Sequence, residues 1–102
     1  MEDNLAKKLP PFDSEAERAI ICSMLFESDA ASYAHEHLNA NDFYRPDFQL
    51  IFTAMQELIF ENEPIDVITV KNKLEQSGLL QKIGGIDFLT QLANDFYTSA
   101  NL

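Results

Sequence analysis

The stretch from Asn41 to Leu80 constrains the fold of this chain more than any other part, because nearly every boundary in it has a local cause. Pro46 suits the first position of a helix, where no N–H group is needed, and apolar residues follow it at helical spacing. These residues are Phe48, Leu50, Ile51, Phe52, Ala54, Met55, Leu58 and Ile59. A stripe that wide must be buried against several partners. The pattern therefore predicts a central core helix that ends near Glu61 or Asn62.

A second helix is predicted after a tight turn. Pro64 disfavours a helical conformation for the residue before it, so the first helix cannot continue straight on. Asp66 is a good N-cap for the next helix. At the far end, Gly78 fits the left-handed position that follows the last turn, and Leu79 can then fold back onto Leu74. The stretch as a whole predicts a helix-turn-helix pair.

An earlier helix is predicted to begin at Asp13 or Ser14 and to end near Phe26. Residues 14–17 match a capping box, in which Glu17 would bond back to the start of its own helix. From Ala19 to Phe26 the only polar residue is Ser23. This pattern predicts a helix that is enclosed nearly all round.

A short helix and a loop are predicted between these two regions. The helix spans roughly residues 30–38, and its expected inward residues are Tyr33, Ala34 and Leu38. Asn39, Asn41 and Asp42 form the loop that follows, because short polar side chains compete with helical hydrogen bonding. Two aromatic residues are expected to anchor that loop, namely Phe43 and Tyr44.

The end of the chain is predicted to contain one more clear helix. Residues 79–83 read as a short turn or a one-turn helix, and Gly84 and Gly85 break it. The helix then spans about Ile86 to Asn94, with an apolar face made by Phe88, Leu89, Leu92, Ala93 and, just beyond, Phe96. Thr98 and Ser99 look like the cap of a further helix.

These elements predict an all-α domain, a compact bundle of about five to six short helices. The length of 102 residues suits one domain with a real core, which needs no metal or disulfide to fold. Residues 1–9 are polar with weak periodicity and are expected to be a flexible lead-in. Residues 10–102 are expected to form the single helical domain.

Charge and cysteine content narrow the possible functions. Seventeen acidic residues against seven basic ones give a net charge of −10, which disfavours direct nucleic-acid binding because phosphates are gripped mainly by Lys and Arg. The single cysteine, Cys22, lies in an apolar run and is expected to be a small core residue in a reducing cytoplasm. No segment approaches the roughly 18 apolar residues of a membrane span.

No catalytic, cofactor-binding or metal-binding site is predicted. His35 and His37 are two residues apart, so on a helix they point in different directions and cannot chelate one ion together. Gly84 and Gly85 are not part of a phosphate-binding motif, and the acidic clusters contain no EF-hand loop. A small hydrolase is disfavoured because no catalytic motif is present.

The ordered landmarks of the chain resemble the N-terminal domain of the bacterial replicative DNA helicases of the DnaB family. The resemblance covers about residues 10–102. In order, it rests on Pro10, Pro11, Glu15, Ala16, Glu17, Asp42, Phe43, Tyr44, Pro46, Ile51, Phe52, Ala54, Met55, Pro64, Ile65, Asp66, Thr69, Val70, Leu74, Gly78, Gly84, Gly85, Leu89, Leu92, Ser99, Ala100 and Asn101. The chain departs from the family pattern at Cys22, at Leu102, and at Phe96 and Tyr97, which replace a usual Val-Pro pair.

The resemblance implies an assembly and recruitment role. In that family the N-terminal domain forms a collar tier on a hexameric ring and recruits primase. A helical hairpin that pairs neighbouring subunits follows it, and this chain is expected to stop before that hairpin. ATP and Mg²⁺ belong to a RecA-like motor domain further along, so no family catalytic residue falls in this stretch. A contact with a helicase loader is left open.

Two residues are candidates for a partner surface, Phe96 and Tyr97, since exposed aromatic rings are useful anchors. The alternative, which we favour for Phe96, is that its ring simply closes the core. The alternative function is a free-standing acidic all-α adaptor that binds a partner helix in a groove.

Overall fold

The computed structural model describes residues 13–100, and these residues form helices without any strand. The elements are α2 (Ser14–Phe26), α3 (Ser28–His37), η1 (Ala40–Asp42), α4 (Pro46–Phe60), α5 (Val67–Gln76), η2 (Leu80–Ile83) and α6 (Gly85–Ala100), where η marks a 3-10 helix. The predicted all-α bundle is therefore confirmed. The expected lead-in, residues 1–9, lies outside the described residues.

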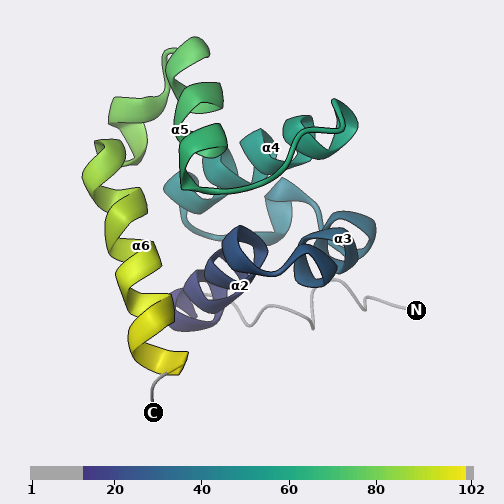
Figure 1. The fold of residues 1–102 in the computed structure, drawn as a ribbon, viewed down its shortest axis with the longest axis vertical. Coiled ribbons are helices and arrows are strands. Elements are labelled where there is room, and N and C mark those ends of the chain that lie inside the picture. Colours follow the sequence, from purple (N-terminus) through teal and green to yellow (C-terminus); the bar gives the residue numbers. More distant parts are fainter. Residues whose placement is uncertain (1–12, 101–102) are drawn as a thin grey trace.

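Helix α4 lies at the centre of the bundle, as its wide apolar stripe predicts. It packs against α2 and α5, while α6 runs along one side of the molecule beside α5 and then beside α2 (Figure 1). Of the predicted stripe, Leu50 and Ile59 alone are only partly buried. The large apolar side chains that are almost fully buried are Ile21, Met24, Phe43, Phe48, Ile51, Phe52, Met55, Val70, Leu74, Leu89 and Leu92.

The predicted α4–α5 pair is confirmed, and both helices end in the same way. After α4, Asn62 takes a left-handed φ of 61°, and the N–H of Glu63 donates to the carbonyl oxygen of Leu58 at 2.8 Å. After α5, Gly78 has a φ of 73°, and the N–H of Leu79 donates to the carbonyl oxygen of Leu74 at 2.8 Å. This is the Schellman arrangement, which satisfies carbonyl groups that the helix leaves without partners.

Asp66 caps α5 at its other end, as predicted. Its Oδ1 accepts a hydrogen bond from the N–H of Thr69 at 2.8 Å, and its own N–H donates to the Oγ1 of Thr69 at 2.9 Å. The two residues thus satisfy each other's backbone groups in a capping box, with Thr in the place where Glu is common.

The orientation predicted for Tyr33 is wrong, because this side chain is 62% exposed. The inward residues of α3 are Ala31 and Ala34, with Leu38 just after the helix. Tyr33 is two residues from Ala31, which places it on nearly the opposite face of a helix with 3.6 residues per turn. There its ring stacks on His37, with the ring centroids 4.0 Å apart.

The predicted end of the last helix is also wrong. Helix α6 does not stop near Asn94 but continues to Ala100, so Thr98 and Ser99 lie inside it rather than capping another helix. The extra turns have a tertiary cause. The ring of Phe96 stacks on that of Phe26 in α2 at a centroid distance of 4.6 Å, which fastens this part of α6 to a neighbouring helix.

Helix α2 is not enclosed all round as its apolar run predicts. Ile21, Met24 and Leu25 are buried in the core, but Ala19 is exposed and Ser23 is only partly covered. One stripe of α2 therefore faces solvent, and in the predicted apolar run this stripe consists of the small residues Ala19 and Ser23.

Glu17 has a long-range role in place of the predicted local one. Asp13 is the N-cap of α2 and accepts from the N–H of Ala16 at 3.0 Å. Glu17 is 1% exposed, and its carboxylate accepts from the backbone N–H groups of Tyr44 at 2.7 Å and Arg45 at 3.3 Å. These donors stand immediately before α4, where the positive end of the helix dipole favours a negative charge.

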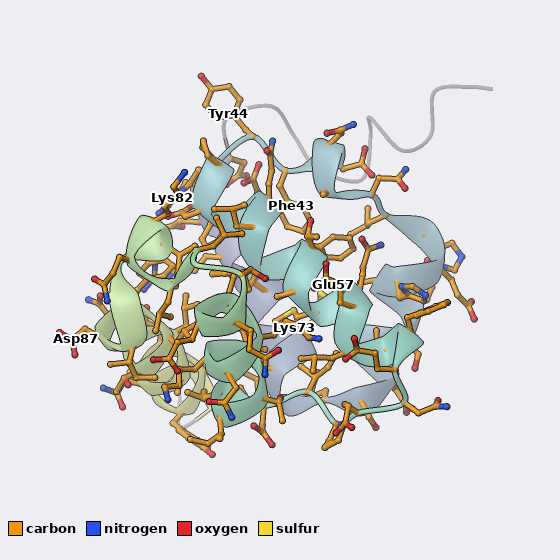
Figure 2. All side chains as sticks on the ribbon, turned by 90° about the horizontal axis from the view of Figure 1, so that it is seen from above. Phe43, Tyr44, Glu57, Lys73, Lys82 and Asp87 are labelled. Carbon is orange, nitrogen blue, oxygen red and sulfur yellow. The ribbon has the colours of Figure 1, made fainter. Side chains whose placement is uncertain are left out.

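The loop before α4 is anchored by the side chain of Phe43 and by the backbone of Tyr44. The Phe43 side chain is 1% exposed, whereas the Tyr44 side chain is 59% exposed and points outward from the molecule (Figure 2). The backbone of Tyr44 is nevertheless held by Glu17 at 2.7 Å. The predicted anchoring role is thus right for Phe43 and wrong for the side chain of Tyr44.

We predict that Glu17→Gln lowers the free energy of unfolding by about 2 kcal/mol. An amide offers only one acceptor oxygen, so its NH₂ group would face a backbone N–H donor in a buried site. Urea unfolding followed by circular dichroism measures the change. Glu15→Gln, an exposed substitution in the same helix, is the matched control and should change the free energy by less than about 0.5 kcal/mol. Equal effects of the two substitutions would contradict the role given to Glu17.

Candidate partner-binding surface

The two predicted surface residues, Phe96 and Tyr97, lie at the C-terminal part of α6 but have different surroundings. The Phe96 side chain is partly buried and packs against the core, so its ring closes one edge of the bundle. Tyr97 is 58% exposed, with its ring centroid 5.2 Å from that of Phe26. Packing thus accounts for Phe96, whereas most of the Tyr97 side chain is exposed to solvent.

An ion pair fastens the same part of α6 to α2. The Nε of Arg18 donates to Oδ2 of Asp95 at 2.7 Å, and a terminal guanidinium nitrogen of Arg18 contacts the same oxygen. The guanidinium also lies over the ring of Phe88, 5.7 Å from its centroid. Arg18 is therefore occupied within the molecule, although it lines the hollow between α2 and α6.

Cys22 is the small core residue that its apolar context predicts. It is 6% exposed, and its Sγ donates to the carbonyl oxygen of Leu92 at 3.4 Å, across the contact of α2 with α6. Burial raises the pKa of the Cys22 thiol because it disfavours the charged thiolate. This geometry suits packing rather than nucleophilic chemistry.

The described cations are mostly neutralised inside the molecule. Each of four basic side chains contacts a carboxylate, in the pairs Arg18–Asp95, Arg45–Asp47, Lys71–Glu75 and Lys73–Glu61. The hydrogen bond to Glu61 raises the pKa of Lys73, and the nearby charge of Glu57 acts in the same direction (Figure 2). Among residues 13–100, Lys82 is the remaining cation. The surface therefore presents mainly unpaired acids.

Residues 13–100 hold neither a metal-binding cluster nor a membrane-spanning helix. No group of three or more His, Cys, Asp or Glu side chains in this part of the chain could hold an ion. His37 stacks on Tyr33, and its Nδ1 lies 2.8 Å from the carbonyl oxygen of Tyr33. No helix in the same range is long and apolar enough to cross a bilayer.

The comparison with protein families decides the identity of the fold. Residues 9–102 match the family model described as the DnaB-like helicase N terminal domain. The chain belongs to the DnaB family. Its domain is the N-terminal domain of a replicative helicase, and the sequence resemblance to that family is confirmed.

Individual relatives agree with this assignment. The chain is 40% identical to the replicative DNA helicase DnaC of Bacillus subtilis, with 100% of this chain and 22% of that protein covered. It is 39% identical to the replicative DNA helicase DnaB of Mycobacterium leprae, with 90% of this chain and 15% of that protein covered. The chain thus spans about a fifth or less of the length of these DnaB relatives.

A solved structure shows the same fold. The crystal structure of the N-terminal domain of DnaB helicase from Mycobacterium tuberculosis matches this chain with a TM-score of 0.78 and 39% sequence identity. The match covers 83% of this chain and 59% of that one. The arrangement of helices described above is therefore that of a DnaB N-terminal domain.

Sequence reasoning missed two parts of this DnaB surface. Phe26 forms the third ring of a cluster with Phe96 and Tyr97, whereas its place in an apolar run predicts only that it lies in a buried helix. The Arg18–Asp95 pair joins residues that are 77 positions apart, so no local pattern indicates it. The one available signal was the spacing of Phe96 from Leu92 and Leu89, which continues the apolar face of α6 beyond Asn94.

We predict that alanine substitutions at Phe96 and Tyr97 lower the free energy of unfolding by different amounts, because Phe96 packs against the core and Tyr97 is mostly exposed. Phe96→Ala should lower the free energy of unfolding by about 2 kcal/mol, less than for a fully buried Phe because its ring is partly exposed. Tyr97→Ala should lower it by less than about 1 kcal/mol. Denaturant titration of both variants measures the difference. A larger loss for Tyr97→Ala than for Phe96→Ala would reverse these assignments.

Proposed function

We propose that this chain is the N-terminal assembly and protein-recruitment domain of a hexameric, ATP-dependent replicative DNA helicase. The observation that carries the proposal is the match of residues 9–102 to the DnaB-like helicase N terminal domain. In this role the domain contributes to the collar tier of the ring and helps to recruit primase. A helicase loader is the second class of partner that we propose for this role.

The chemistry of the 102 residues supports a role without catalysis. The sequence contains no phosphate-binding loop, and we place ATP and Mg²⁺ in a separate motor domain of the parent protein. Residues 10–102 then act as one helical domain, followed in the parent by the hairpin that pairs neighbouring subunits. We place the whole assembly in the cytoplasm, where it acts on replicating DNA.

The surface supports protein partners over phosphates. Basic side chains that could release counterions from a nucleic acid are mostly held in ion pairs, as for Arg18 and Lys73. An acidic surface with exposed aromatic rings is suited to contacts with basic or apolar protein surfaces. Tyr97 is the residue that we assign to such a contact. The neighbouring ring of Phe96 packs against the core and so holds this part of α6 in place.

Recruitment is tested by titrating this chain with the C-terminal helical domain of primase in a calorimeter. We expect measurable binding, weakened about tenfold by Tyr97→Ala, as is typical when an aromatic anchor is truncated. The matched control is Ile68→Ala, which removes a side chain of similar exposure, 62%, from α5. No heat of binding with the unchanged chain would count against primase recruitment. Equal binding by both variants would remove Tyr97 alone from the contact.

We also predict that this chain does not bind single-stranded DNA measurably at physiological salt. Its net charge of −10 repels phosphates, and four of its described cations are already paired. Fluorescence anisotropy with a labelled oligonucleotide measures this. Micromolar binding that falls steeply with added salt would contradict the prediction.

The second candidate function is a free-standing acidic adaptor that binds a partner helix. The open groove between α2 and α3 favours it, because such grooves accept amphipathic helices. The coding sequence that follows residue 102 distinguishes the two functions. A hairpin and a phosphate-binding ATPase domain there would exclude the adaptor.

A further inference from the structure

An open groove of about 440 Å³ lies between α2 and α3, and none of its lining residues belongs to α6. The groove is open because both helices carry small side chains there, which leave space that larger side chains would fill. Ala19 and Ser23 face it from α2, and Ala30 and Ala34 face it from α3. Its remaining lining residues are Ile20, Met24, Tyr33 and Leu38. Apart from the hydroxyls of Ser23 and Tyr33, the side chains of this lining are apolar.

Tyr33 stands at the edge of this groove with its ring already positioned. The ring is 62% exposed to solvent, yet it stacks on His37 at a centroid distance of 4.0 Å and an interplanar angle of 19°. A ring that is held before binding loses little conformational freedom on binding. A held and exposed tyrosine beside an apolar groove has the character of a binding anchor.

The charges beside the groove select the chemistry of an occupant. Glu15, Ala19 and Ser23 follow one another at intervals of four and form a ridge along α2, and Glu27, the C-cap residue, follows where the helix ends. Both glutamates are exposed, and neither forms an ion pair with another described residue. The nearest cation of the same helix, Arg18, is already paired with Asp95. Ala19 and Ser23 line both the α2–α3 groove and the hollow between α2 and α6, whereas Glu15 and Glu27 line that hollow but not the groove. Unpaired carboxylates therefore stand at the two ends of the ridge that borders the groove.

We propose that the α2–α3 groove binds an amphipathic helix of a partner protein, with small aliphatic residues on one face and Lys or Arg at its flanks. The aliphatic face fills the groove against Tyr33, and the basic flanks meet Glu15 and Glu27. The ridge with its small central residues lets the partner helix approach closely, in the manner of ridges-into-grooves packing. A second copy of this chain is disfavoured as occupant, because each copy carries a net charge of −10. The inference is independent of whether the partner is primase.

The first test uses a fluorescein-labelled helical peptide of about 18 residues, with Leu and Ala on one face and Lys and Arg beside them. A scrambled peptide of the same composition is its control. We expect saturable binding to this chain, at least about tenfold tighter than for the scrambled peptide, since only the former presents one apolar face. In NMR titrations the shifted amides should lie in α2 and α3. Absence of binding, equal binding of the scrambled peptide, or shifts confined to other helices would overturn the proposal.

The second test uses substitutions of exposed residues, so that the fold is kept. Ala19→Trp fills the groove and Tyr33→Ala removes its edge, and each should weaken peptide binding about tenfold. The matched bulk control is Thr53→Trp on the exposed side of α4, which should leave binding unchanged. Circular dichroism checks that every variant remains folded. If Ala19→Trp and Tyr33→Ala bind the peptide as tightly as the Thr53→Trp control does, the proposal is overturned.

Charge is tested by a pair of double variants that change the net charge equally. Glu15→Gln with Glu27→Gln should weaken binding and reduce its dependence on salt. Glu57→Gln with Glu63→Gln, on the α4 side of the molecule, is the control. Equal effects of the two double variants would show a general attraction and overturn the assigned site. Self-association of the unchanged chain that Ala19→Trp abolishes would assign the groove to a second copy, and would likewise overturn the proposal.

Discussion

The buried carboxylate of Glu17 makes the contact on which the position of α4 against α2 depends. It joins α2 to the backbone just before α4, accepting from Tyr44 and Arg45 across 27 and 28 positions of sequence. Burying an ionised carboxylate is costly unless its oxygens are satisfied, and here both oxygens accept a backbone N–H. Both donors immediately precede Pro46, so the contact fixes the chain where it enters α4, while the N–H of Phe48 in the first turn donates to Asp47 of the same helix. One interaction therefore fixes the entry of the chain into the central helix and the position of that helix against α2.

The parts of the fold that could be predicted are those whose causes are local. The boundaries of α4 and α5 follow from Pro46, Asp66 and Gly78, and each acts through the backbone within a few residues of itself. The positive φ of Asn62 belongs to the same class, since Asn tolerates the left-handed region better than other residues with a Cβ. Such signals are independent of what the helix packs against. This is why the helix pair was predicted with nearly correct ends.

The parts that could not be predicted are set by contacts between distant segments. Glu17 matches a local capping box, but its carboxylate is taken by a loop far along the chain. Tyr33 looks like a core residue by type, yet in so short a helix the two buried alanines determine which face turns inward. Helix α6 continues past Asn94 because Phe96 finds Phe26 on another helix. In each case the local pattern allowed two outcomes, and a tertiary contact chose between them.

One face of helix α2 packs in the core, and the opposite face is open to solvent. One face carries Glu17 and Cys22 inward, where they hold α4 and α6. The opposite ridge leaves Ala19 and Ser23 between two hollows, one shared with α6 and one with α3. Because internal ion pairs occupy the neighbouring cation, Arg18, the acids of that ridge remain available to an external partner. Unpaired acids beside small apolar residues suit a basic, apolar protein partner better than phosphates, and the proposed recruitment role needs this property.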